Sequence, residues 1–208
     1  MAKTTTASRP MTNGQIENAV AKLRDALRKH RTEFGSEPVQ LVLGVENLGM
    51  ELLAPFRKRV EAVSNLIVRR VTVNRTRTPQ SMLDATGRKQ HTNQDVVDAM
   101  PRGEGEKAEV YFFKPDLTKR GGWISDADLE GEEFESRGFA PADPYTLAAV
   151  NQADRTFTDD HPNGTHWKDA DGQWCFVAFD RWYDRPSVNV DRRDFGWSAY
   201  WWFAGVRK

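Results

Sequence analysis

Apolar residues in the first third of the chain recur at the spacing of one helix face. The first such set falls at i, i+4, i+7 and i+11 and comprises Ile16, Val20, Leu23 and Leu27. This pattern predicts a helix from about residue 13 to 34, which Thr12 or Asn13 can cap. Residues 39–45 predict a short buried helix or a strand, of which we prefer the helix, and residues 50–65 predict another helix.

Short strands and short helices alternate in the middle of the chain. Residues 66–73 and 108–114 are rich in β-branched or aromatic residues, which predicts two strands. Residues 79–86 and 93–100 combine cap residues with short apolar faces, which predicts two short helices. An acidic helix is expected over residues 126–137.

The last part of the chain shows the period-two alternation of strands. Residues 166–168 and 173–179 flank Ala170-Asp171-Gly172, which predicts a hairpin whose Gly172 is left-handed, after a turn at Asn163-Gly164. Two further strands are expected in the segments 187–191 and 199–206. Alternating side chains are apolar on both faces of the hairpin, so we expect the upstream helices to cover both faces.

These elements predict an α+β protein in which a helical N-terminal half packs with a C-terminal antiparallel aromatic-rich β sheet. We expect a disordered tail over residues 1–12, a helical and mixed region over 13–121, and an acidic helix with an aromatic β region over 122–208. The last two regions are expected to pack as one compact unit.

Composition narrows the class of protein further. Thirty basic and thirty acidic residues cancel, which removes any argument from net charge for nucleic acid or an anionic membrane as partner. The single cysteine, Cys175, lies among apolar neighbours and predicts a buried thiol in a reducing compartment. No apolar run resembles a signal peptide or a membrane span, so we expect a soluble, cytoplasmic protein without a membrane partner.

Charge is distributed unevenly along the chain. Residues 57–89 contain nine basic and two acidic residues, whereas residues 123–171 contain twelve acidic and three basic ones. The two segments are expected to face each other or to form solvated surfaces. The alternative is a nucleic-acid-associated protein in which the two short helices act like a helix-turn-helix and phosphates contact Arg75, Arg77, Arg88 and Lys89.

Two histidines stand near two aspartates in the segment Asp159–His166. Such a composition suits a divalent metal or an acid–base pair, so a metal-dependent enzyme using His161 or His166 is a third hypothesis. The other histidines stand in unrelated segments, and Pro and Gly make a turn-rich loop the better interpretation. We therefore expect no catalytic residue, no metal site and no cofactor.

The most aromatic part of the chain is residues 161–207, which contain six of its seven tryptophans. Most of these side chains are expected to form a core, because aromatic residues dominate core packing. Those between the strands are expected to be exposed beside charged residues and to bind a protein or carbohydrate. The predicted ligand-binding residues are Trp182, Tyr183, Asp184, Arg185, Arg193, Phe195 and Trp197.

Three phrases of the sequence, ADPYTLAAVNQAD, HPNGTHWKDADGQWCFVAFDRW and WWFAGVRK, resemble those of a group of small uncharacterised bacterial proteins. Residues 160–208, with a tryptophan hairpin, charged loops and a final aromatic strand, are also similar to C-type-lectin-like modules. The disulfide-forming cysteines and calcium-binding motif of classical lectins are absent from this chain, so the resemblance implies no particular sugar. The sequence thus favours a non-enzymatic binding protein whose C-terminal loops contact a protein or carbohydrate.

Overall fold

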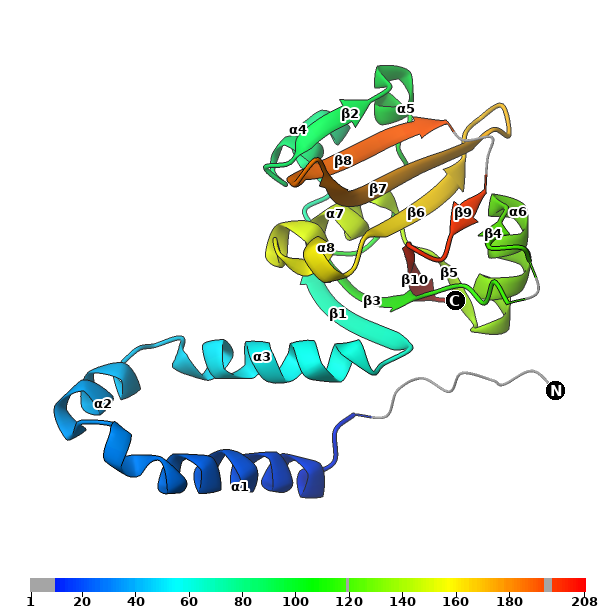
Figure 1. Ribbon diagram of the computed structural model, residues 1–208. Coiled ribbons are helices and arrows are strands. Elements are labelled where there is room, and N and C mark those ends of the chain that lie inside the picture. The colour runs from blue at the N-terminus through cyan, green and yellow to red at the C-terminus, as the bar shows by residue number, and fades with distance from the viewer. Residues whose placement is uncertain (1–9, 119, 193–195) are drawn as a thin grey trace. The chain divides into compact units, whose positions relative to one another are not determined.

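The computed structural model describes residues 10–118, 120–192 and 196–208, which form two compact units (Figure 1). The units divide between Ser64 and Asn65, whereas the sequence places a boundary between residues 121 and 122. Most of the expected disordered tail lies outside the described residues. We call residues 10–64 the helical unit and residues 65–208 the sheet unit.

The helical unit contains the three predicted helices, including the helix preferred over a strand near residue 40. They are α1 (Asn13–Lys29), α2 (Ser36–Leu43) and α3 (Leu48–Ala62). Thr12 caps α1 in a capping box with Gln15, in which each side chain bonds the other residue's backbone N–H. Pro55 lies inside α3. Although residues 10–64 are all described, none of these helices contains a buried residue.

No single helix in the described residues is long and apolar enough to cross a membrane. Together, α2 and α3 reach the necessary length and composition, but their axes meet at a bend of 88°.

The sheet unit is built on a mixed sheet with short helices between its strands. Its strands are β1 (Leu66–Thr72), β2 (Lys89–Thr92), β3 (Lys107–Phe113), β5 (Phe139–Pro141), β6 (Asn163–Lys168), β7 (Trp174–Trp182), β8 (Arg185–Arg192) and β10 (Trp202–Arg207). The remaining strands, β4 (Trp123–Ile124) and β9 (Trp197–Ser198), form a separate two-stranded sheet. Its helices are α4 (Pro79–Asp84), α5 (Gln94–Asp98), α6 (Asp126–Asp128), which continues into a π-helix over Leu129–Phe134, α7 (Pro144–Ala153) and α8 (Phe157–Asp160).

The main sheet has the order β1-β3-β10-β6-β7-β8-β2, with β5 added beside β10. Figure 1 shows β2, β8, β7 and β6 side by side. Most pairs are antiparallel, as expected, but β10 pairs with β6 and β2 pairs with β8 in parallel. The predicted α+β class is confirmed.

Both faces of the sheet are apolar, as the alternation in the hairpin predicts. Cys175, Val177 and Phe179 belong to one buried cluster, and Phe176 and Ala178 belong to the other. Residues from α4, α5 and α7 complete the first cluster, whereas the π-helix and β9 complete the second. Neither cluster includes any described residue of the helical unit, so helices that follow β1 provide the cover.

Two local expectations are wrong, each for a reason that the sheet supplies. The pair Asn163-Gly164 begins β6 instead of forming a turn, because both residues pair with β10 on one side and with β7 on the other. The linker between the two short helices contains β2, which pairs with β8, so these helices do not form a helix-turn-helix. Gly172 has the predicted left-handed conformation, with φ 77°.

Candidate functional site

The turn between β7 and β8 projects two aromatic side chains into solvent. The two strands pair as far as Trp182 and Arg185, so Tyr183 and Asp184 alone form the turn. Trp182 is 48% exposed and Tyr183 is 88% exposed, as the sequence predicts for this loop. We call the exposed residues Arg181, Trp182, Tyr183, Asp184, Arg185 and Pro186 the hairpin tip.

The backbone of the hairpin tip has an unusual conformation for its residues. Tyr183 has φ 48° and Asp184 has φ 59°, the left-handed values that a two-residue type I′ turn requires at both central positions. Asn and Gly adopt these values at little cost, whereas a bulky side chain such as Tyr is strained there. An exposed tyrosine at a position that favours glycine is therefore a candidate for a role in binding rather than in stabilising the fold.

Polar and aromatic contacts hold the hairpin tip in place. The guanidinium of Arg181 donates to the Asp184 carbonyl oxygen at 2.6 Å and pairs with the Asp159 carboxylate at 2.8 Å. The indole of Trp182 lies 5.0 Å from the ring of His91 on β2 and is stacked with the Tyr183 ring at 6.2 Å. The tip is therefore braced from two sides, by α8 and by β2.

Trp197, another residue predicted for this ligand site, does not join the hairpin tip. Trp197 is completely buried, which corrects the expectation that it is exposed. Its indole packs edge-on against Phe176 and Phe203 and its Nε1 donates to Asp126 Oδ1 at 2.6 Å. The predicted residues Arg193 and Phe195 lie outside the described residues.

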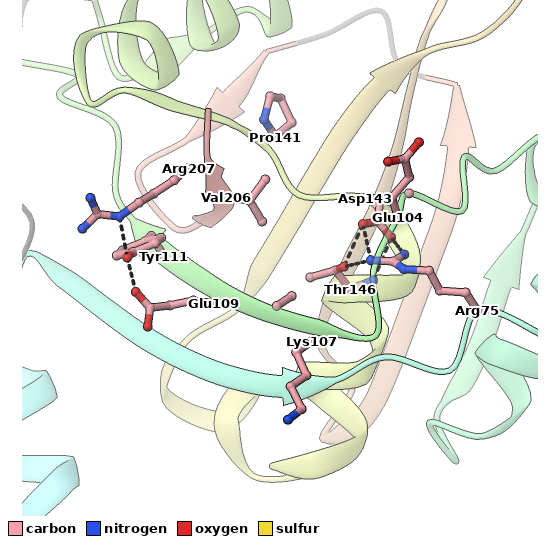
Figure 2. A pocket seen from close by; sticks show the side chains of 12 residues that line it. Arg75, Glu104, Lys107, Glu109, Tyr111, Pro141, Asp143, Thr146, Val206 and Arg207 are labelled. Carbon is pink, nitrogen blue, oxygen red and sulfur yellow. Dashed lines mark hydrogen bonds and ion pairs between the residues drawn. The ribbon is translucent and has the colours of Figure 1, made fainter.

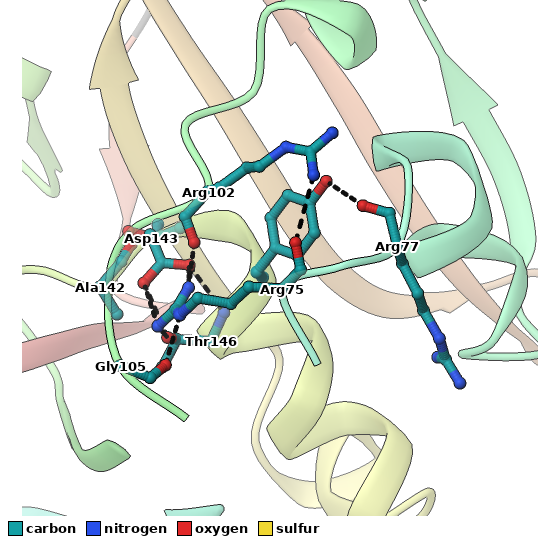
Figure 3. Close-up of polar contacts among 9 residues, drawn as sticks. Arg75, Arg77, Arg102, Gly105, Ala142, Asp143 and Thr146 are labelled. Carbon is teal, nitrogen blue, oxygen red and sulfur yellow. Dashed lines mark hydrogen bonds and ion pairs between the residues drawn. The ribbon is translucent and has the colours of Figure 1, made fainter. Parts of the chain in front are cut away.

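Arg75, predicted as a phosphate contact, is bound within the protein (Figure 3). Its guanidinium donates to both carboxylate oxygens of Asp143, at 2.8 and 3.2 Å, and to Thr146 Oγ1 at 3.0 Å. It also donates to the carbonyl oxygens of Gly105 and Arg102. Asp143 is the N-cap of α7, so Arg75 ties the end of β1 to the start of that helix.

The remaining residues of the nucleic-acid hypothesis differ in accessibility. Arg88 is only 7% exposed and donates to Thr158 Oγ1 and the Arg155 carbonyl oxygen, so it is not the surface contact expected. Burial lowers its pKa, against the opposing effect of Asp159. Arg77 is half-buried and donates to Gln152, whereas Lys89 is exposed on β2. The four residues thus do not form one open basic surface.

The two segments of opposite charge meet within the sheet unit. Arg75 pairs with Asp143 at 2.8 Å and Arg69 pairs with Asp154 at 3.5 Å. Both carboxylates flank α7 instead of lying on the acidic helix. Part of the surplus of positive charge in residues 57–89 is therefore neutralised by ion pairs within the protein.

A cavity of about 480 Å³ lies beside Arg75 and is lined by two separate polar clusters (Figure 2). One cluster contains Arg75, and in the other Arg207 Nε donates to the Tyr111 hydroxyl at 2.8 Å. That hydroxyl donates to Glu109 and lowers the pKa of its carboxyl group. Because these charged groups already pair with one another, the cavity offers a ligand few groups in need of a partner.

His166 forms a buried chain of hydrogen bonds with an aspartate and a tryptophan. Its Nδ1 lies 2.6 Å from Asp126 Oδ1, which also accepts the bond from Trp197 Nε1. Since a carboxylate only accepts, the proton of this contact lies on Nδ1 of His166. The ring is stacked on Trp174 at 4.8 Å. Among the described residues, its buried Nε2 has no hydrogen-bond partner.

His166 lines a second cavity, of about 390 Å³, together with Trp167, Lys168, Trp174 and several prolines. The Nε1 of Trp167 is likewise buried, and within the described part of the chain no acceptor bonds to it. Two residues of the cavity lining therefore each have a buried ring nitrogen that the described residues do not satisfy. The sequence pointed to His166 but not to Asp126, which lies 40 positions away and shows no local signal.

The second predicted histidine, His161, has a different environment. Its ring stacks on Phe157 at 5.0 Å and meets Trp202 edge-on at 5.2 Å. Across residues 10–118, 120–192 and 196–208, no three His, Cys, Asp or Glu side chains gather closely enough to hold a metal ion. The structure therefore offers the metal-dependent hypothesis no ligand set within these ranges.

Comparisons of this chain with protein-family models, with curated protein sequences and with solved structures find no significant match.

Proposed function

We propose that this chain is a binding protein whose hairpin tip inserts into a pocket on a partner protein. The observation that carries the proposal is Tyr183, which is 88% exposed although its backbone has a strained left-handed conformation. A type I′ turn formed for stability alone favours Asn-Gly, so Tyr-Asp at these positions suggests selection for what the turn presents.

The composition of the hairpin tip supports a protein partner. Tyr, Trp and Arg are the residues enriched among interface hot spots, and the tip contains Trp182, Tyr183 and two arginines. The turn protrudes between two paired strands, a shape that fits a pocket better than it encloses a sugar. The bonds from Arg181 to Asp184 and Asp159 fix the tip before binding, which reduces the entropy lost on association.

The test is affinity capture from cells of the source organism, with the full chain, Trp182→Ala/Tyr183→Ala and Trp123→Ala as baits. Trp123 on β4 is 57% exposed, so it is a control for the loss of an exposed indole elsewhere. We expect to capture a partner protein that binds the wild type and the Trp123→Ala control equally. Its affinity for the double variant should be roughly tenfold or more lower. Equal capture by all three baits would refute the proposal, and a glycan array on which only the double variant fails would assign the tip to carbohydrate instead.

A second candidate function is the binding of a small hydroxylated ligand, such as a sugar ring, in the His166 cavity. Its support is that His166 and Trp167 line this cavity and that each has a buried ring nitrogen without a partner among the described residues. Hydroxyl groups of a ligand can satisfy such nitrogens, because a hydroxyl both donates and accepts. The test is titration with a panel of monosaccharides, read by tryptophan fluorescence. We expect saturable quenching that His166→Phe abolishes, and quenching that persists in this variant would contradict the candidate.

A further inference from the structure

The helical unit leaves an ordered row of apolar side chains on α1 in solvent. Ile16, Val20, Leu23 and Leu27 are between 44% and 54% exposed. In soluble proteins, an amphipathic helix gains most of its stability by burying this face against another element. Although every residue of the helical unit is described, no residue of α1 is buried, so this face is open to an occupant.

The spacing of these side chains is that of a coiled-coil seam. Steps of four, three and four residues separate them, so Val20 and Leu27 occupy a positions and Ile16 and Leu23 occupy d positions of a heptad. The seam is narrow, because small or polar residues flank it. These are Glu17 and Arg24 at e, and Ala19 and Ala26 at g. A strict a/d seam of this kind packs against another helix.

We propose that two copies of this chain associate through α1, paired antiparallel. This pairing places Ile16 in a layer with Leu27 of the second copy, and Val20 in a layer with Leu23 of the second copy. In antiparallel pairs, e positions face e positions, so Glu17 of each copy lies beside Arg24 of the other. Facing g positions bring Ala19 beside Ala26, and their small side chains allow close approach. The contact is therefore complementary to itself in both shape and charge.

The other long helix lacks this complementarity. Leu53, Phe56 and Val60 on α3 have the same spacing and are 40–48% exposed. Antiparallel pairing of α3 with itself places Arg57 beside Arg57 of the second copy, and like charges at such positions repel. A membrane surface is a poorer occupant for α1 than a second helix, because a helix bound at a membrane usually has a broader apolar face.

The test measures the mass of the full chain by sedimentation equilibrium over a concentration series. We expect a dimer of twice 23.7 kDa that dissociates on dilution. Val20→Asp should weaken dimerisation at least roughly 100-fold, because each dimer then buries two carboxylates in the seam. The matched control is Val60→Asp on α3, where the valine is 48% exposed against 53% for Val20. This control should remain a dimer.

A charge exchange tests the antiparallel arrangement without touching the seam. Glu17→Arg alone and Arg24→Glu alone should each weaken the dimer, because each brings like charges together across the interface. The double variant Glu17→Arg/Arg24→Glu should restore the affinity. A monomeric wild type, whether or not it binds anionic vesicles, would overturn the proposal. Equal losses in Val20→Asp and Val60→Asp, or a double variant weaker than both single variants, would also overturn it.

Discussion

The helical unit and the sheet unit use apolar residues in opposite ways. In the sheet unit, two buried clusters fill both faces of the main sheet, and side chains as large as Trp197 and Phe112 are completely buried. In the helical unit, three helices with regular apolar faces contain no buried residue, although every residue from 10 to 64 is described.

This difference teaches that amphipathic periodicity predicts a helix without predicting what covers it. A helix of 17 residues such as α1 is marginally stable by itself in water, even with a capping box. The sheet unit completes its own core, whereas the three helices of the helical unit bury none of their residues. Substitutions of similar chemistry should therefore change the free energy of unfolding strongly in the sheet unit and weakly in the helical unit.

The largest expected effect is that of Trp197→Ala. Removal of this buried indole leaves a cavity and takes one donor from Asp126, so we expect a loss of about 4 kcal/mol in unfolding free energy. The equivalent truncation in the helical unit, Leu41→Ala, removes a side chain that is 78% exposed. It should change the free energy of unfolding by less than about 0.5 kcal/mol.

Denaturant unfolding measures both variants, followed by tryptophan fluorescence for Trp197→Ala and by far-ultraviolet circular dichroism of the helices for Leu41→Ala. All seven tryptophans lie in the sheet unit, so the fluorescence signal reports that unit alone. Trp182→Ala, at the exposed hairpin tip, is a second control and should leave stability nearly unchanged. A Trp197→Ala protein as stable as Trp182→Ala would mean that the contrast in burial has no energetic counterpart.

Arg75→Met should have the next largest effect. It removes the partner of the half-buried Asp143 carboxylate and the donors to two carbonyl oxygens, and we expect a loss of about 3 kcal/mol. In the helical unit, Arg57→Met replaces an exposed arginine and should cost less than about 0.5 kcal/mol. Denaturant unfolding at equal salt measures both variants. Equal free energies of unfolding would mean that the contacts of Arg75 with Asp143 and Thr146 in Figure 3 do not stabilise the sheet unit.

Much of the fold could be predicted from local patterns. The hairpin, its left-handed Gly172 and the two-faced alternation of β7 follow from turn chemistry and period-two spacing. The strand β2 could not be predicted, because its sequence KQHT has little apolar character and its pairing with β8 joins residues about 100 positions apart. Parallel pairs such as β10 with β6 depend equally on distant residues.

The candidate site was predicted less evenly than the fold. Trp182 and Tyr183 lie at a turn beside charged residues, and their exposure follows from that position. Trp197 stands in a similarly polar stretch, yet β4 pairs with β9 and draws its side chain into a core that no local pattern reveals. The charge of Arg88 suggested an accessible site, but contacts with residues about 70 positions away bury it.

The smallest expected effect concerns Asp180 on β7, whose Oδ1 is buried and, within the described residues, accepts no hydrogen bond. Burial raises the pKa of its carboxyl group, against the opposing effects of His91 and Arg88. A carboxyl with a raised pKa in the folded state binds its proton more tightly there than in the unfolded chain. Its contribution to stability therefore falls as the pH rises from the ordinary carboxyl range through the folded pKa.

Asp180→Asn should remove that fall, so the variant should be more stable than the wild type near about pH 7 and lose this advantage near about pH 3. Urea unfolding across this pH range measures the difference. Glu46→Gln, at an exposed position of the helical unit, should follow the wild type throughout. A gain in the free energy of unfolding of Asp180→Asn that does not depend on pH would contradict this prediction. It would mean that packing, and not the buried charge, distinguishes Asp180 in the sheet unit from an exposed carboxylate in the helical unit.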